Sequence, residues 1–181
     1  MKILVLVDCQ NDFISGSLGS KEAQAIVPNV VEKIMSLEDD DCLVLTQDEH
    51  YSDYLKTQEG TNLPVKHCIF NTDGIEINTD IMRAISEKAD DYRVYHKSTF
   101  GSLEMANVFY DYARTEEVDS IEFVGLCTDI CVILNALIMK TFLPQVEIVV
   151  DASCCAGVTP ESHKAALTVM KSCQIKVINE Y

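Results

Sequence analysis

Two cysteines lie four residues apart in the stretch VGLCTDICVILNA, which covers residues 124–136. Cys127 follows an apolar run, and Cys131 falls in the first turn of a helical pattern. A thiol in that turn faces unpaired backbone N–H groups and the positive end of the helix dipole, which favour the thiolate. With Thr128 or Asp129 as the N-cap, Cys131 is a candidate nucleophile whose pKa we expect to be lowered. A buried cysteine that only fills the core is the alternative.

Two further groups could support a thiol nucleophile from distant parts of the chain. Asp8 ends the apolar run KILVLVD, and Lys97 follows the run YRVYH. A carboxylate beside a thiol can act as its general base, and an ammonium beside both stabilises the two anions. Taken singly, Asp8 could be an ordinary turn residue and Lys97 a solvated one. Taken with Cys131, they indicate covalent catalysis by an activated cysteine.

A second group of residues has the composition of a metal site. Asp48 and His50 are two residues apart in TQDEH, so both side chains lie on one side of an extended segment. His67 in LPVKHC is the third candidate ligand, Glu59 the fourth, and Asp53 a weaker choice. Two histidines and a carboxylate suit Zn, Fe(II) or Mn. A solvent-exposed pair at a strand end is the alternative.

An alternation of strands and helices must position these groups. Apolar runs rich in β-branched residues predict six strands, at 2–8, 42–48, 92–96, 120–126, 146–151 and 175–179. Helical patterns predict helices at about 28–37, 79–89, 102–115, 129–142 and 160–172, the last with Thr159 as N-cap before Pro160. This order predicts a mostly parallel six-stranded sheet with helices on both faces, a three-layer, doubly wound α/β fold. Ligands of such folds bind beyond the carboxyl ends of the strands, where the candidate residues are expected.

Length and spacing favour a single domain over residues 1–181. The chain has no repeat, no low-complexity tract and no linker rich in proline or glycine, and 181 residues suffice for one buried core. Residues 51–78 follow no clear helical or strand pattern. A connection of that length within a compact domain is usually functional.

The composition argues against several classes of protein. With a net charge of −15 and a pI of about 4.5, the chain lacks the clustered cations that nucleic acids or anionic membranes require. No apolar run approaches the ~18 residues of a membrane span, and MKILVLVDC is too short for a signal peptide. Eight cysteines without a secretion signal indicate reduced thiols in a cytoplasmic protein, rather than a disulfide framework or a four-cysteine zinc site.

Five motifs, taken together, resemble those of a known superfamily. In chain order they are VDCQNDF (7–13), TQDEH (46–50), HCIFNTDG (67–74), HKSTFGS (96–102) and GLCTDICV (125–132). This series resembles the isochorismatase-like cysteine hydrolases, and the tail DASCCAGVTPESHKAAL (151–167) is similar to the region after their fifth strand. The resemblance covers nearly the whole chain. Within the superfamily it is greatest to nicotinamidases, because of the DxH and HC motifs.

The resemblance implies a role for each matching residue. The implied catalytic triad is Asp8, Lys97 and Cys131. The implied ligands of a divalent metal, usually zinc, are Asp48, His50 and His67. A cis bond between Leu126 and Cys127 would aim the backbone N–H groups of Cys127 and Cys131 at one point, as an oxyanion hole. Phe13 would contact the substrate ring.

The resemblance also implies a reaction and an assembly. The reaction is hydrolysis of a small-molecule amide, nicotinamide to nicotinate and ammonia, through a thioester on Cys131. The assembly is a homo-oligomer, a dimer or tetramer, for which the apolar helix 130–142 is a candidate interface. Other members of the superfamily cleave N-carbamoyl or ureido compounds or, without the cysteine, the vinyl ether of isochorismate. The presence of Cys131 favours an amide hydrolase.

The chain also departs from the nicotinamidase pattern. It has no tryptophan, although many nicotinamidases hold the pyridine ring between a phenylalanine and a tryptophan; Leu63 and Pro64 occupy that stretch here. The candidate replacements are Tyr51, Tyr54 and Phe70. No histidine closely follows the DxH motif, so Glu59 would serve instead. A non-catalytic metal- or thiol-sensing module, with Cys154 and Cys155 storing oxidation, is the alternative outside the enzymes; core packing after the fifth strand is the simpler role for that pair.

Overall fold

The computed structural model describes residues 1–89 and 91–180. Its six strands are β1 (Lys2–Val7), β2 (Cys42–Asp48), β3 (Arg93–Lys97), β4 (Ser120–Leu126), β5 (Glu147–Ala156) and β6 (Lys176–Ile178). They form one sheet in the order β3-β2-β1-β4-β5-β6, and every neighbouring pair is parallel. The direction of winding reverses between β1 and β4, and this switch point is where ligands of doubly wound sheets bind.

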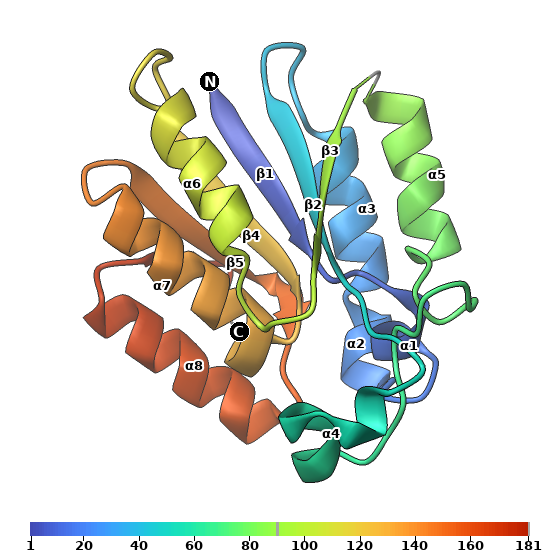
Figure 1. The fold of residues 1–181 in the computed structure, drawn as a ribbon. Helices are drawn as coiled ribbons and strands as arrows, with labels where there is room; N and C mark the ends of the chain where they lie inside the picture. The colour runs from blue at the N-terminus through green and yellow to red at the C-terminus, as the bar shows by residue number, and fades with distance from the viewer. Residues whose placement is uncertain (90, 181) are drawn as a thin grey trace.

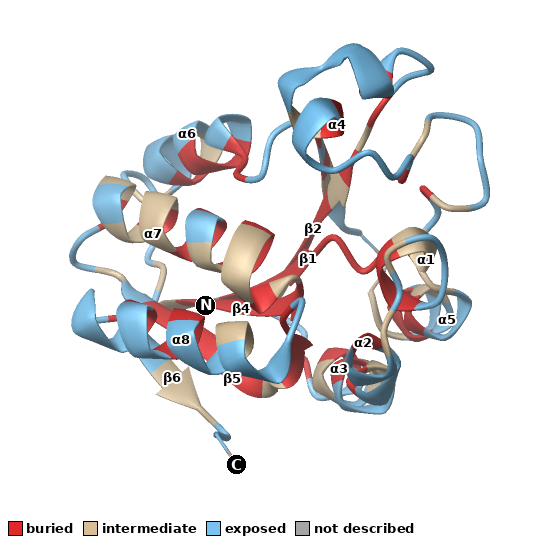
Figure 2. Ribbon diagram, turned by 90° about the horizontal axis from the view of Figure 1, so that it is seen from below, coloured by how far each residue is buried: buried red, intermediate tan, exposed pale blue. Residues whose placement is uncertain are grey.

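Helices cover both faces of the sheet (Figure 1). Those on one side are α6 (Leu103–Tyr112), α7 (Ile133–Phe142) and α8 (Pro160–Ser172), and those on the other are α1 (Asn11–Ile14), α2 (Lys21–Ala25), α3 (Val27–Met35) and α5 (Thr79–Lys88). Figure 2 looks onto the carboxyl ends of the strands and shows the two helix layers on either side of the sheet. A short 3-10 helix (Tyr54–Lys56) and α4 (Gln58–Asn62) lie beyond these ends. The predicted three-layer, doubly wound α/β fold is confirmed, and the sheet is parallel throughout.

Each face of the sheet has its own apolar core. On β1, Ile3, Val5 and Val7 pack toward α6, α7 and α8, whereas Leu4 and Leu6 pack toward α3 and α5. A strand that is buried on both faces needs this continuous apolar sequence, which is why MKILVLV reads as a run without alternation. Among the described residues, no helix combines the length and hydropathy that a membrane span requires.

β1 and β4 approach each other closely where the two strands end. Gly125 on β4 has a φ of +117°, and a Cβ atom there would lie 2.1 Å from the carbonyl oxygen of Val7. No other residue could adopt this backbone conformation at that separation. Asp8, the residue after Val7, has a φ of +48°. The chain therefore turns out of β1 at the residue that bears the carboxylate.

Several element boundaries differ from the predicted ones. The fifth strand continues past residue 151 to Ala156, with a register irregularity against β4 between Phe123 and Gly125. The predicted helix 129–142 is a π-helical turn at Thr128–Val132 followed by α7. The short helices α1, α2 and α4 were not predicted, because four or five residues cannot display a helical period. The Thr159 cap of α8 is confirmed as a capping box with Ser162.

Candidate active site

Three reactive side chains from three different elements meet at the carboxyl edge of the sheet. The ammonium nitrogen of Lys97 lies 2.6 Å from Asp8 Oδ2 and 3.7 Å from Cys131 Sγ. All three residues are buried, Asp8 completely. Asp8 follows β1, Lys97 ends β3, and Cys131 lies in the turn after β4. The structure therefore brings together the acid, the cation and the thiol that the sequence singles out.

Burial determines the protonation of this group. Burial and the neighbouring Asp8 carboxylate raise the pKa of the Cys131 thiol well above that of free cysteine. Burial also raises the pKa of Asp8, although the charge of Lys97 opposes the shift. The expected lowering of the Cys131 pKa is therefore wrong, because desolvation outweighs the helix terminus. A thiol held in its neutral form needs a base, and Asp8 with its raised pKa is a stronger base than an exposed aspartate.

The turn that carries Cys131 differs from the predicted capped helix start. The Leu126–Cys127 peptide bond is cis, as the resemblance implies. Neither Thr128 nor Asp129 caps the helix: the N-cap position belongs to Cys127, without a side-chain hydrogen bond. The Cys127 carbonyl instead accepts hydrogen bonds from the backbone N–H groups of residues 130 and 132, at 3.1 and 3.0 Å. The chain is thus wound tightly around Cys127, with Cys131 inside the π-helical turn.

Asn135 ties this turn to the loop after β3. Its side-chain amide donates hydrogen bonds to the carbonyl oxygens of Cys131 (2.8 Å) and Phe100 (3.2 Å), and its oxygen accepts from the Ser102 N–H (2.9 Å). The residue is fully buried on α7, one helical turn after the cysteine. Asn135 therefore links the turn that carries Cys131 to the loop that follows Lys97.

Asp48, His50 and His67 form a compact group beside the thiol. One ligand atom from each residue lies within 4.8 Å of the others, and all three residues are buried. Both histidine Nε2 atoms face Asp48 Oδ2, at 2.9 Å from His50 and 3.4 Å from His67. Glu59 Oε1 lies 3.5 Å and 3.6 Å from the same two nitrogens. Asp53 is exposed at the N-cap of the 3-10 helix and does not belong to this group.

The chemistry of these atoms fits a divalent metal ion. Among the residues that the structure describes, the buried Nε2 of His50 has no hydrogen-bond partner, as expected of a nitrogen whose lone pair is a metal ligand. His67 Nδ1 lies 2.9 Å from the Val65 carbonyl oxygen, so it carries the ring proton and leaves Nε2 with a lone pair. Although burial opposes it, the neighbouring side chains of His50 and His67 and the charge of Lys97 hold the pKa of Asp48 well below its usual range. Two imidazoles and a carboxylate are ligands of Zn, Fe(II) and Mn.

Gln10 positions Asp48, and the sequence reasoning did not find it. Its buried amide donates to the carbonyl oxygens of Asp48 (2.8 Å) and Ile75 (2.9 Å), and its oxygen accepts from the Asp48 N–H (2.8 Å). The side chain thus pairs with the Asp48 peptide as a neighbouring strand would. The only local signal is a glutamine two residues after Asp8, at the end of a buried strand.

We expect Gln10→Ala to lower metal affinity about 10- to 100-fold, the usual effect of removing a group that orients a ligand. Gln47→Ala is the matched control, because the Gln47 side chain donates to the same Ile75 carbonyl (3.1 Å), while the hydrogen bonds to the Asp48 backbone come from the Gln10 side chain. Metal content after dialysis against graded chelator measures the difference. Equal metal retention by the two variants would contradict this role.

Aromatic rings surround the two histidines. The Tyr54 ring lies 4.6 Å from that of His50 and 5.0 Å from that of His67, between centroids, and Tyr54 is buried. Phe13 also packs against His67, with its ring centroid 5.4 Å from that of His67. Tyr51 and Phe70 contact each other at the surface, 5.8 Å apart. Of the three candidate aromatic replacements, Tyr54 is the one that packs against the histidines. Its hydroxyl donates a hydrogen bond to the backbone carbonyl of Leu63 (3.0 Å).

The Cys154–Cys155 pair lies within β5 rather than after it. Both residues are buried, and because strand side chains alternate, Cys154 packs into the core on the α3 side and Cys155 into the core on the α6–α8 side. The two thiols point to opposite faces of the sheet, which does not suit them to store oxidation as a pair. All eight cysteines are free.

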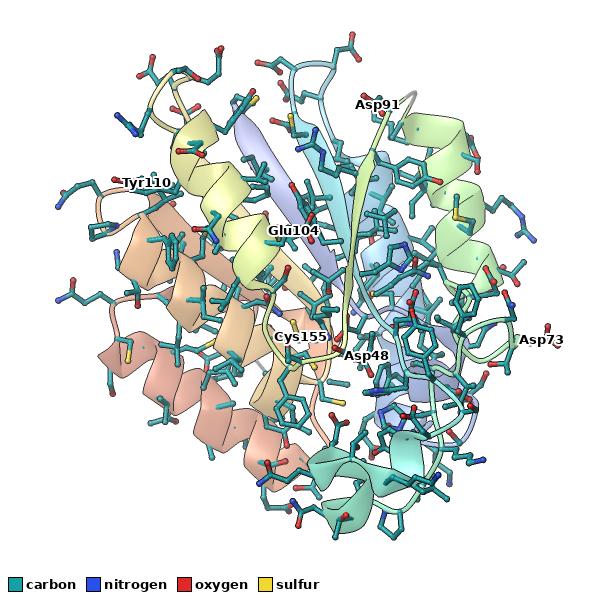
Figure 3. All side chains as sticks on the ribbon, viewed as in Figure 1. Asp48, Asp73, Asp91, Glu104, Tyr110 and Cys155 are labelled. Atoms are coloured by element: carbon teal, nitrogen blue, oxygen red, sulfur yellow. The ribbon has the colours of Figure 1, made fainter. Side chains whose placement is uncertain are left out.

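A cleft of about 850 Å³ opens far from these residues, at the amino-terminal ends of β2 and β3. Asp91, Tyr92 and Tyr112 are among the residues that line it. Figure 3 shows Asp91 at that end of the sheet and Asp48 at the other. The cleft therefore contains none of the candidate catalytic groups.

The sequence and fold agree with one known family. The isochorismatase domain model matches residues 2–180. The chain belongs to the isochorismatase family. The nicotinamidase/pyrazinamidase of Mycobacterium tuberculosis is 25% identical over 186 residues, which cover 98% of each chain.

Solved structures of the isochorismatase family have the same fold. A nicotinamidase/pyrazinamidase from Bacillus subtilis superimposes with a TM-score of 0.82 at 25% identity, covering 98% of this chain and 99% of its own. A pyrazinamidase from Pyrococcus horikoshii in complex with zinc superimposes with a TM-score of 0.81 at 26% identity, covering 99% of both chains. The predicted resemblance is confirmed at the level of the family.

Proposed function

We propose that this protein is a metal-dependent cysteine amidohydrolase that converts nicotinamide and water to nicotinate and ammonia. The observation that carries the proposal is one ammonium, Lys97, within 3.7 Å of a thiol and two carboxylates, one of which belongs to the Asp48–His50–His67 group. Nicotinamidases among its relatives support the amide, and Phe13 beside His67 supports an aromatic ring.

Asp8 and Cys131 perform the proton and acyl transfers. Asp8 accepts the thiol proton as sulfur attacks the amide carbon; the S–C bond forms, and the carbonyl π electrons move to oxygen. When the C–N bond breaks, Asp8 returns the proton to nitrogen, ammonia leaves, and a thioester remains. Water then attacks this thioester with Asp8 again as base, and the C–S bond breaks to release the acid and the thiol. Lys97 compensates the negative charge at each stage.

The remaining groups bind and polarise the substrate. The backbone N–H groups of Cys127 and Cys131 donate to the tetrahedral oxyanion, and losing one such donor typically costs about 2.7–4 kcal/mol. A divalent ion, zinc in our proposal, would be held by Asp48, His50, His67 and, as fourth ligand, Glu59. When bound, it supplies Lewis-acid chemistry and a contact for the substrate.

Ammonia release from nicotinamide and pyrazinamide tests the proposal directly. We expect turnover with at least one of them and a loss of about 100-fold or more after chelation, because a metal ion contributes several kcal/mol to such reactions. Added zinc should restore the rate in chelated protein but not in a mock preparation from the same host. Turnover of an N-carbamoyl compound, without turnover of nicotinamide or pyrazinamide, would assign the protein to another branch of the family. Background rates with every amide would favour the sensing module.

We further propose a cytoplasmic homo-oligomer in which residues 1–181 act as one domain. Eight free cysteines support the reducing compartment. The exposed side of α7 supports assembly: Leu134 is 38% exposed, and Lys140 is the single charged residue of that helix. Light scattering at several protein concentrations tests for a dimer or tetramer.

A further inference from the structure

A hydrogen bond from α8 reaches into the turn that carries the nucleophile. Thr128 Oγ1 and His163 Nδ1 lie 2.8 Å apart, and Thr128 is completely buried. Thr128 directly follows Cys127 and precedes Cys131 by three residues, so it lies between the two backbone N–H groups assigned above to the oxyanion. Nothing in the acyl-transfer chemistry uses this pair of side chains.

The start of α8 holds His163 at that position. The Thr159–Ser162 capping box fixes the first turn, and the His163 N–H donates to the Thr159 carbonyl oxygen (2.9 Å). The imidazole is half-buried, and burial lowers its pKa, so the ring is neutral at neutral pH and pairs with a hydroxyl rather than with an anion.

A second contact links the loop between β5 and α8 to the turn of Cys127–Cys131. Asp129 Oδ1 accepts a hydrogen bond from the Val158 N–H (3.0 Å). A Cβ atom on Gly157 would lie 3.0 Å from that Asp129 oxygen and 2.9 Å from the His163 backbone nitrogen. The loop from β5 to α8 is therefore closely packed on the nucleophile turn, and only glycine fits at its closest point.

We infer that His163 is a positioning residue, which fixes the oxyanion-binding turn of Cys127–Cys131 through the Thr128 hydroxyl. This inference rests on the proposed function, since it assigns a rate effect to the geometry of the two N–H groups. A displacement of about 1 Å at a catalytic group can lower a rate about 100-fold, so partial loosening of the turn predicts a smaller loss.

We expect His163→Leu and Thr128→Val each to lower kcat roughly tenfold with little change in KM, because the oxyanion exists in the transition state and not in the bound substrate. Thr128→Ser keeps the hydroxyl, and His163→Asn places a side-chain amide near the position of Nδ1. Both variants should stay within about threefold of the original kcat. The double variant Thr128→Val, His163→Leu should lose no more kcat than either single variant, since both partners of the hydrogen bond are then apolar. Thr168→Val is the control on α8, because the Thr168 hydroxyl donates to the Lys164 carbonyl of the same helix.

Two probes of Cys131 separate positioning from general damage. Pyridine-3-carbaldehyde is the aldehyde analogue of the proposed substrate. The Cys131 sulfur adds to its carbonyl carbon, the thiol proton passes to Asp8, and the carbonyl π electrons pass to an oxygen in the oxyanion position. Iodoacetamide alkylates the same sulfur at a saturated carbon: the S–C bond forms as iodide leaves, and no oxyanion forms. In His163→Leu, affinity for the aldehyde should fall with kcat, while the rate of inactivation by iodoacetamide and the melting temperature stay near those of the original protein.

Three outcomes decide between the two proposals. Unchanged kcat and aldehyde affinity in folded His163→Leu would overturn the positioning role while leaving the amidase intact. If His163→Leu does not fold, Thr128→Val decides by the same two measurements. A protein that hydrolyses no amide but still loses aldehyde affinity in these variants would refute the proposed function and keep the positioning role.

Discussion

Cys131→Ala should abolish amide turnover, with a loss of about 10⁴-fold or more in kcat, as when the nucleophile of a hydrolytic triad is removed. The rate falls this far because the proposed acyl intermediate forms on the Cys131 sulfur. Metal content should be unchanged, since the sulfur lies beside Lys97 and is not part of the Asp48–His50–His67 group. Ammonia release and metal analysis on the same sample give both results.

Cys127→Ala is the matched control for this experiment. The two cysteines share one turn, but Cys127 contributes its backbone N–H, which alanine retains. Burial raises the pKa of the Cys127 thiol to about 12, and the contact with the Lys97 ammonium belongs to the Cys131 sulfur. Its alanine variant should keep kcat within a few fold. Equal loss in both variants would show that the turn, and not the Cys131 sulfur, was damaged.

Asp8→Asn should lower kcat by about 10²- to 10⁴-fold, the range expected for loss of a general base. Asparagine has the shape of aspartate and can still contact Thr46, whose hydroxyl donates to Asp8 Oδ1 (2.6 Å). The Asp8 charge is one of the causes that raise the pKa of Cys131. Alkylation of Cys131 by iodoacetamide should therefore stay as fast or become faster while turnover collapses.

Thr46→Val provides the graded comparison for Asp8→Asn. It removes the hydrogen bond and keeps the carboxylate, so we expect a loss in kcat of about 10- to 100-fold, in line with about 1.5–3 kcal/mol for a hydrogen bond to a charged group. A parallel fall of turnover and alkylation in Asp8→Asn would mean that Asp8 organises the site rather than moving the proton.

The site residues that lie at the ends of strands could be predicted from the sequence. Asp8, Lys97 and Cys131 each follow an apolar run, and parallel strands bring their carboxyl ends to one edge. The spacing of Asp48 and His50 needed only the alternation of a strand. These inferences depend on local pattern and on one topological rule, and the structure brings the predicted residues together.

The supporting contacts could not be predicted in this way. Gln10 meets the Ile75 carbonyl 65 residues later, and Thr128 meets His163 across 35 residues. No periodicity relates such partners, because a side chain can reach any backbone group that the fold brings near. The sign of the Cys131 pKa shift was also missed, since a helix terminus is visible in a sequence and the depth of burial is not.

The position of Lys97 couples the catalytic triad to the Asp48–His50–His67 group. The same ammonium faces the base of the triad at 2.6 Å and a metal ligand, Asp48 Oδ1, at 3.5 Å. The ammonium therefore lies between two anionic centres, and neutralising one of them would favour its movement toward the other. Thermodynamic linkage makes this relation reciprocal: whatever factor ion occupancy contributes to substrate affinity, substrate must return to ion affinity.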